Sequence, residues 1–251
     1  MRTPIIAGNW KLNKTISEAV ALTTALKTLV AEVTDVDIIV APPFTVLASV
    51  RDALAGSNIH LSAQDVYSED SGAFTGEVSA LMLKDVGCDY VIIGHSERRQ
   101  YFGETNESVN QKVKAALAHG LKPIICVGEQ LEERESGRTE AVIEDHVTGG
   151  IVGLSAAELL SCVIAYEPVW AIGTGKTATP AQAQEVHGFI RGLLTKAYSA
   201  EVASQICIQY GGSVKPENAS ELMSQPDVDG ALVGGASLEA ESFAQIVKFD
   251  Q

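Results

Sequence analysis

The sequence has few basic residues for its length. Of 251 residues, 18 are Lys or Arg and 32 are Asp or Glu, so the formal net charge is −14 at pH 7. Nucleic acids and anionic membrane surfaces repel such an acidic chain, and we expect neither as a partner. An anionic ligand would have to be held by local groups rather than by the overall field of the protein.

Cysteines are also few, and long hydrophobic runs are absent. The four cysteines lie in or beside apolar strand-like runs without paired spacing: Cys88, Cys126, Cys162 and Cys207. This pattern favours buried reduced thiols over disulfides or metal ligands, and it predicts a cytoplasmic protein. No apolar run is long enough to span a bilayer, and the first residues are too briefly apolar for a signal peptide. We therefore expect a soluble protein.

The sequence does contain a series of eight short apolar runs separated by helical patterns. The runs occupy residues 5–10, 38–41, 59–63, 90–93, 124–127, 163–165, 205–210 and 230–233. Their spacing averages about thirty residues, the length of one strand-helix-strand unit. No linker interrupts the series, so residues 1–251 are predicted to form one α/β domain. The pattern fits either a closed barrel of eight parallel strands or an open doubly wound sheet.

Individual helix signals support this alternation. Residues 15–18 form a capping box that opens a helix, and residues 179–182 form another with Pro180 at its first position. Val109, Val113 and Leu117 are spaced four apart and are followed by Gly120, which indicates a helix that ends there.

Polar and glycine residues follow several of the predicted strands. Both candidate architectures place ligands at the carboxyl ends of their strands, so these residues carry the functional information. They are Asn9 and Lys11, His95 and Glu97, Glu167, the segment 211–213 that ends in Ser213, and the pair Gly234 and Gly235. They converge on one site only if the sheet closes into a barrel.

The stretch from residue 163 to 178 reads as a strand, a loop and the approach to a helix. Glu167 lies where the strand ends, because Pro168 cannot donate a hydrogen bond to a sheet. The apolar loop that follows contains Gly173 and Gly175, so it could act as a lid. A phosphate-binding P-loop is excluded because Trp170 stands where that motif requires glycine. Residues 173–178 satisfy the loose dinucleotide pattern only weakly, since their glycines precede the helix cap.

A carboxylate beneath an apolar lid would be desolvated and more basic, so Glu167 is a candidate general base. Its alternative role is that of an ordinary buried ion-pair member. His95 could donate a hydrogen bond to a substrate oxygen or could be structural. Lys11 could stabilise an oxyanion, with Glu97 either holding its ammonium group or pairing with a neighbouring arginine.

Three further histidines, His60, His119 and His187, lie inside a strand or towards helix surfaces and are expected to have structural roles. The glycine pairs after the last two strands could present backbone N–H groups to a phosphate. Barrels build phosphate sites at this position, which favours that function over simple turns.

These motifs resemble the triosephosphate isomerase family over the whole chain and in the family's order. They are Asn9-Trp10-Lys11, the segment 94–99 (GHSERR), the segment 165–175 (AYEPVWAIGTG), the segment 210–213 (YGGS) and the segment 232–235 (LVGG). The resemblance implies a single-domain (β/α)8 barrel. It also implies interconversion of dihydroxyacetone phosphate and D-glyceraldehyde 3-phosphate through an enediolate, in glycolysis and gluconeogenesis, without cofactor or metal.

By this resemblance Glu167 is the base, neutral His95 polarises the carbonyl, and Lys11 with Asn9 stabilises the oxyanion. Glu97 supports Lys11. Backbone groups at Gly173, Ser213, Gly234 and Gly235 would bind the phosphate. The resemblance further implies a homodimer in which the loop from residue 64 to 77 reaches the neighbour's site. The alternative that we keep is a nucleotide-binding α/β enzyme that uses the 173–178 glycine loop.

Overall fold

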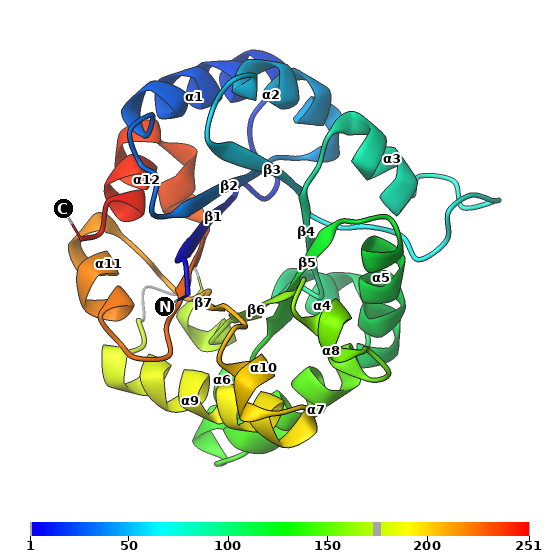
Figure 1. Cartoon of the computed structure of the whole chain (residues 1–251), viewed down its shortest axis with the longest axis vertical. Coiled ribbons are helices and arrows are strands. Elements are labelled where there is room, and N and C mark those ends of the chain that lie inside the picture. The colour runs from blue at the N-terminus through cyan, green and yellow to red at the C-terminus, as the bar shows by residue number, and fades with distance from the viewer. Residues whose placement is uncertain (1, 173–176, 251) are drawn as a thin grey trace.

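The computed structural model describes residues 2–172 and 177–250. Within these residues, eight parallel strands close into a barrel, and helices surround it on the outside (Figure 1). The strands are β1 (Ile5–Asn9), β2 (Asp37–Ala41), β3 (Ile59–Ala63), β4 (Tyr90–Ile93), β5 (Lys122–Val127), β6 (Val163–Tyr166), β7 (Ile208–Tyr210) and β8 (Gly230–Val233).

The described helices follow the strands in alternation. The α-helices are α1 (Ile16–Leu29), α2 (Leu47–Leu54), α3 (Ala80–Val86), α4 (Ser96–Phe102), α5 (Asn106–Ala118), α6 (Leu131–Glu135), α7 (Thr139–Ile151), α8 (Ala156–Leu159), α9 (Pro180–Ala197), α10 (Ala200–Ala203), α11 (Pro216–Met223) and α12 (Ala240–Val247). Three short 3-10 helices are η1 (Phe44–Val46), η2 (Val169–Ala171) and η3 (Gly235–Leu238).

Closure of the sheet depends on the pairing of the first and last strands. β1 pairs with β8 in parallel from Ile5 opposite Gly230 to Gly8 opposite Val233. Gly230 has φ +154°, and a Cβ there would lie 2.0 Å from the carbonyl oxygen of Ile5. Only glycine fits this close approach. The closed barrel implied by the resemblance is therefore confirmed, and the open sheet is excluded.

The core has two parts because successive residues of a strand point to opposite sides. Ile5 and Ala7 belong to a buried cluster built of strand residues, which fills the inside of the barrel. Ile6, between them, belongs to the larger cluster in which the strands pack against the outer helices. Strands buried on both faces explain why most of the eight runs are nearly continuously apolar rather than alternating.

The helix signals in the sequence are confirmed. Thr15 caps α1 and Thr179 caps α9, each in a capping box, and Pro180 is the first residue of α9. Val109 and Val113 are buried residues of α5. Capping side chains satisfy N–H groups that a helix leaves unpaired in its first turn, so these local patterns locate helix starts well.

Two strand boundaries differ from expectation by more than one residue. β7 was expected from residue 205 but begins at Ile208, because Gln205 N–H closes the turn after α10 and the carbonyl of Ile206 accepts a hydrogen bond from Arg191. β5 begins at Lys122, two residues early, and includes Pro123. Backbone groups used by turns and side chains are unavailable to a strand ladder.

The loop between β3 and α3 extends outwards beyond the ring of helices (Figure 1). Its Tyr67 and Phe74 rings lie 4.7 Å apart, and Tyr67 N–H donates to Val78 O at 2.8 Å. These contacts give the projecting loop its own internal packing. Among the described residues, we find no helix with the length and apolar character needed to cross a membrane.

Candidate active site

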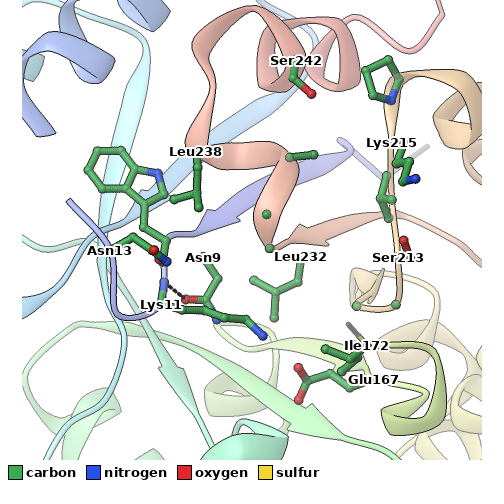
Figure 2. A pocket seen from close by; sticks show the side chains of 18 of the residues that line it. Asn9, Lys11, Asn13, Glu167, Ile172, Ser213, Lys215, Leu232, Leu238 and Ser242 are labelled. Atoms are coloured by element: carbon green, nitrogen blue, oxygen red, sulfur yellow. Dashed lines mark hydrogen bonds between the residues drawn. The ribbon is translucent and has the colours of Figure 1, made fainter. Parts of the chain in front are cut away.

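A cavity of about 740 Å³ opens at the carboxyl ends of the barrel strands. Seven of the residues singled out from the sequence line it: Asn9, Lys11, His95, Glu167, Ser213, Gly234 and Gly235. They come from the carboxyl ends of five different strands or the loops that follow them, so closure of the barrel brings them together as expected. In Figure 2, Lys11 and Glu167 extend into the same space from facing walls.

Lys11 occupies an unusual backbone conformation, with φ +51°. The Asn9 side-chain oxygen accepts a hydrogen bond from Lys11 N–H at 3.0 Å, a local turn that tolerates this conformation. Gln64 holds the other side of the residue, because its amide nitrogen donates to Lys11 O at 2.9 Å and to Ala41 O at 2.8 Å. Gln64 could not be recognised from the sequence as a support for Lys11, since it is distant in sequence and has no motif of its own.

The Lys11 ammonium is paired with Glu97, as the sequence reasoning favoured. The Lys11 Nζ to Glu97 Oε1 distance is 2.5 Å. The alternative partners of Glu97, Arg98 and Arg99, instead contact Glu104 and the carbonyl of Gly94, respectively. The pair is partly exposed to solvent, so it orients the ammonium group more than it stabilises the fold.

Glu167 is buried, with 2% of its side chain exposed, and both of its oxygens are engaged. Oε1 lies 2.8 Å from His95 Nε2, and Oε2 accepts a hydrogen bond from Ser96 N–H at 2.9 Å. The carboxylate must leave both partners before it can reach a substrate carbon. The structure therefore contains the candidate base in a retracted position.

The hydrogen bonds of His95 define its protonation pattern. His95 is the N-cap of α4, and its Nδ1 accepts from Glu97 N–H at 3.2 Å. An accepting Nδ1 carries no proton, so the proton of the neutral ring is on Nε2, which faces Glu167. This tautomer leaves Nε2–H as a donor for a substrate oxygen once Glu167 has moved.

The pKa shifts of this pair oppose one expectation. Burial would lower the pKa of His95, but the adjacent Glu167 carboxylate raises it above its usual value. Burial would raise the pKa of Glu167, but His95 and the Ser96 N–H hold it below its usual value. Glu167 is thus not more basic in the retracted position, contrary to the sequence-based expectation, because hydrogen bonds to the charged form outweigh desolvation. Moving it away from His95 removes this effect.

The glycines after β7 have a role that differs from the expected one. Gly211 N–H donates to Tyr166 O at 2.7 Å, so it is not available to a phosphate. A Cβ at Gly211 would lie 2.8 Å from Glu167 Cγ, and one at Gly212 would lie 2.2 Å from the Tyr210 hydroxyl oxygen. These glycines make room for the candidate base and for Tyr210. Ser213 lines the cavity as expected.

The second glycine pair keeps its expected position. Gly234 and Gly235 line the cavity, and η3 begins at Gly235. The N–H groups at the start of a helix have no carbonyl partner within that helix, and the start of η3 lies in the cavity wall. Gly173, the remaining predicted phosphate contact, lies outside the described residues, as do Gly175 and the rest of the segment 173–176.

The described part of the loop before residue 173 is held by a buried carboxylate that the sequence reasoning missed. Glu129 is fully buried, and its Oε1 accepts from the Tyr166 hydroxyl at 3.1 Å and from Trp170 Nε1 at 2.9 Å. Val169 N–H also donates to the Glu129 backbone carbonyl at 3.1 Å. Glu129 therefore anchors Trp170.

Among the other histidines, His60 and His119 pair with Asp89 and Asp70, which fits their structural roles. His187 was expected on a helix surface but is fully buried, with its ring 5.8 Å from that of Tyr166, because it lies on the barrel-facing side of α9. Within residues 2–172 and 177–250, no group of three or more His, Cys, Asp or Glu side chains could hold a metal ion.

Comparisons with known proteins agree with this geometry. Residues 4–250 match the family model described as triosephosphate isomerase. The chain is 61% identical over 249 residues to the triosephosphate isomerase of Trichlorobacter lovleyi, covering 99% of each chain. It is 59% identical over 251 residues to that of Endomicrobium trichonymphae, covering 100% of each, and 60% identical over 248 residues to that of Carboxydothermus hydrogenoformans, covering 99% of each. This protein, with Glu167, His95 and Lys11 gathered around one cavity at the carboxyl end of a closed barrel, belongs to the triosephosphate isomerase family.

Proposed function

We propose that this protein interconverts dihydroxyacetone phosphate and D-glyceraldehyde 3-phosphate, and so acts in glycolysis and gluconeogenesis. The observation that carries the proposal is the meeting of Glu167, His95 and Lys11 around one cavity in a chain of this family. A carboxylate, a hydrogen-bond donor and a cation are the groups that proton transfer next to a carbonyl requires.

In the proposed mechanism, Glu167 leaves His95 and Ser96 and removes a proton from the carbon beside the carbonyl. The C–H electron pair moves into the enediolate, and Glu167 returns the proton to the neighbouring carbon. Without contact to His95, the desolvated carboxylate becomes more basic. His95 Nε2–H donates to the carbonyl oxygen as a neutral acid, a division of roles for which this enzyme family is the standard example.

Charge on the developing oxyanion is stabilised from the β1 side of the cavity. The Lys11 ammonium is oriented by Glu97, and the Asn9 oxygen is engaged by Lys11 N–H, which leaves the Asn9 amide nitrogen as a donor to the substrate. Preorganised donors of this kind stabilise a transition state without reorganisation. The strained backbone of Lys11 is consistent with a functional position.

The phosphate would be bound by backbone groups of Ser213, Gly234 and Gly235, with Gly173 from the lid. This arrangement suits a chain with a net charge of −14, because backbone N–H groups attract a phosphate locally without a basic surface. Lys215 also lines this side of the cavity and adds positive charge to it.

A coupled assay with D-glyceraldehyde 3-phosphate tests the proposal directly. We expect turnover by the purified protein without added metal or nucleotide. The nucleotide-binding alternative is separated by thermal shift: phosphoglycolate should raise the melting temperature and a nucleotide should not. Absence of turnover together with stabilisation by a nucleotide would overturn the proposed activity.

We also propose a homodimer formed through the loop from residue 64 to 77. Large apolar side chains are exposed after four consecutive strands: Leu12 (96%), Phe44 (39%), Phe74 (41%) and Phe102 (68%). Consecutive strands of a barrel are neighbours, so these loops lie on one sector of the molecule, a property typical of interfaces. Sedimentation that shows only a 26.5 kDa species at micromolar concentration would refute the dimer. The free cysteines support a cytoplasmic location.

A further inference from the structure

Glu167 separates two cavities. The first is the substrate cavity, and the second, of about 300 Å³, lies behind the carboxylate. Glu167, Ser96, Cys126, Gly128 and His146 line the second cavity, and the exposed residues Gln100 and Gln130 stand at its rim. The space therefore connects the side of the candidate base that faces away from the substrate with the protein surface.

The two carboxylate oxygens of Glu167 belong to different cavities. Oε1 contacts His95, which lines the substrate cavity, whereas Oε2 accepts from Ser96 N–H, and Ser96 lines the second cavity. When Glu167 advances to the substrate, the position beside Ser96 N–H is vacated. The Ser96 N–H group is then free to donate to a water molecule, and the second cavity has space for that water in the place the carboxylate has left.

His146 gives the second cavity a polar wall. Its Nδ1 accepts from Gly128 N–H at 3.3 Å, so the proton of the neutral ring is on Nε2. Burial lowers the pKa of His146 to about 4, so the ring stays neutral and acts through hydrogen bonding. A cavity of about 300 Å³ with such polar groups has room for several water molecules, since each occupies about 30 Å³ in the liquid.

We propose that the second cavity is the route by which the proton carried by Glu167 exchanges with solvent. This inference rests on the proposed isomerase activity. The substrate C–H bond breaks, the proton forms an O–H bond on Glu167, and the electron pair remains in the enediolate. A water molecule in the second cavity then accepts that proton and returns another from solvent. No group is oxidised or reduced, and isomerisation itself does not require the exchange.

The substrate cavity is a poorer route during turnover. The enediolate and its phosphate occupy that cavity, and water admitted there would reach the intermediate. Water in the second cavity reaches the carboxylate without passing the intermediate. Exchange and isomerisation can therefore be altered separately, which makes the route testable.

The experiment runs the isomerisation of unlabelled D-glyceraldehyde 3-phosphate in D₂O and removes dihydroxyacetone phosphate at once by NADH-dependent reduction. Proton NMR then gives the ratio of product with transferred hydrogen to product with deuterium from solvent. His146→Phe fills the wall with an apolar ring, and His146→Gln keeps an acceptor for Gly128 N–H. We expect His146→Phe to raise this ratio at least about twofold, the factor for loss of one hydrogen-bonding group. His146→Gln should resemble the wild type.

An unchanged ratio in His146→Phe, with or without a lower kcat, would overturn the proposed route. If His146→Phe does not fold, Gln100→Trp narrows the rim and Gln100→Ala widens it, and the ratio should be higher in the first than in the second. Equal ratios would count against the route. A wild-type protein without isomerase activity would reject the proposed function instead, so the two failures are distinguishable.

Discussion

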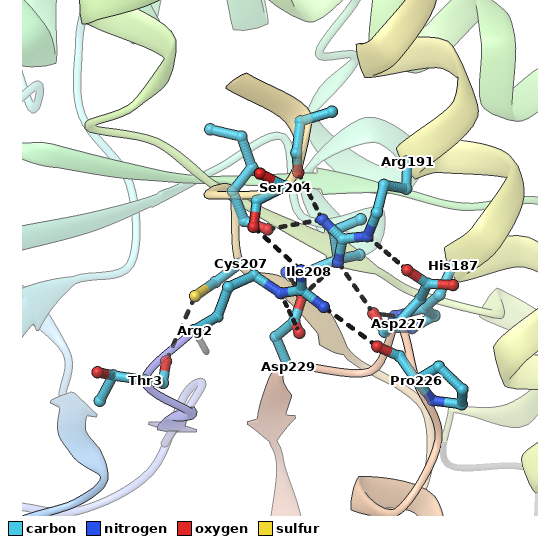
Figure 3. Close-up of polar contacts among 12 residues, drawn as sticks. Arg2, Thr3, His187, Arg191, Ser204, Cys207, Ile208, Pro226, Asp227 and Asp229 are labelled. Atoms are coloured by element: carbon cyan, nitrogen blue, oxygen red, sulfur yellow. Dashed lines mark hydrogen bonds and ion pairs between the residues drawn. The ribbon is translucent and has the colours of Figure 1, made fainter. Parts of the chain in front are cut away.

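The two ends of the barrel use charged side chains in different ways. At the amino end, Arg191 pairs with Asp227 and Asp229, each at 2.5 Å, and donates to the carbonyls of Ala203 and Ile206. Arg2 pairs with Asp229 at 2.6 Å and donates to two further carbonyls (Figure 3). These planar groups are surrounded by acceptors.

Around the substrate cavity at the carboxyl end, Lys11 and Glu167 have contacts that are fewer and easier to exchange. Among the described residues, the Lys11 ammonium, which has three donors, has one carboxylate partner in Glu97. Glu167 is held by two contacts that it must give up to act. The comparison teaches that one end of the barrel joins strands and helices firmly, which allows the other end to keep charged groups available for a substrate.

The largest expected effect is a loss of activity from a change at the carboxyl end alone. Glu167→Asp withdraws the carboxylate by one methylene, and proton transfer requires contact between base and carbon. We expect kcat to fall about 10³-fold, within the range for loss of a general base, with a much smaller change in KM. Coupled kinetics and thermal melts of both proteins measure this. An unchanged kcat would remove Glu167 from the role of base.

The next largest effect is a loss of stability from a change at the amino end alone. Arg191→Met leaves Asp227 and Asp229 without their shared partner, so the free energy of unfolding should fall by about 3 kcal/mol while kcat of the folded protein is retained. For a chain of this size, the melting temperature should fall by roughly 6–12 °C. Arg51→Met is the control, because its ion pair with Asp52 is exposed and should contribute less than about 0.5 kcal/mol. Equal losses in the two variants would contradict the comparison.

A pH experiment sharpens the comparison through His187, which packs between the two ends. Burial lowers its pKa to about 4, while an unfolded histidine titrates near about 6.5. The unfolded state therefore binds the proton first as pH falls, and stability is lost between about pH 6.5 and 4. From pH 7 to 5 this contributes about 2 kcal/mol.

His187→Asn keeps a donor for the Asp227 carbonyl and has no such titration, so its stability should depend less steeply on pH in this window. The pKa of His146 is also lowered to about 4, so His146 makes stability fall with decreasing pH in both the wild type and His187→Asn. Denaturant unfolding at pH 7 and pH 5 gives the two slopes. Parallel slopes would show that His187 does not titrate differently in the folded and unfolded states.

The smallest effect tests the space around the candidate base. In Gly211→Ala, the added Cβ would lie 2.8 Å from Glu167 Cγ, so the flexible glutamate side chain must shift. We expect kcat to fall about tenfold, because displacement of a catalytic group by less than 1 Å is costly. The melting temperature should change little. Gly192→Ala on α9, where a Cβ would meet no atom within 4 Å, is the matched control.

Local patterns in the sequence predicted much of the fold. Capping at Thr15 and Thr179 depends on neighbours within four residues, so it can be read directly. Barrel closure could not be derived from the eight runs, because the Ile5–Gly230 approach joins distant parts of the chain. It was expected only from the resemblance. The burial of His187 was missed for the same reason, since a single polar residue in an amphipathic helix does not indicate what packs against it.

The candidate site was predictable as a set of strand ends but not as an electrostatic arrangement. The Lys11–Glu97 pair was expected, whereas the support from Gln64 and the anchoring by Glu129 were not. The depressed pKa of Glu167 depends on His95 and Ser96 N–H, which contact its two carboxylate oxygens. Spacing along the chain cannot specify such a distance between loops of different strands.

The seam between β1 and β8 also has a consequence for synthesis on the ribosome. Ile5 pairs with Gly230, so the edge of β1 that binds β8 has no partner until almost the whole chain has emerged. At roughly 5–20 residues per second, that interval is about 10–45 s. During this time the nascent protein is an incomplete sheet with an exposed apolar edge, which other nascent chains could pair with. Its most vulnerable period is therefore before release, and a chaperone that shields the β1 edge would protect it best.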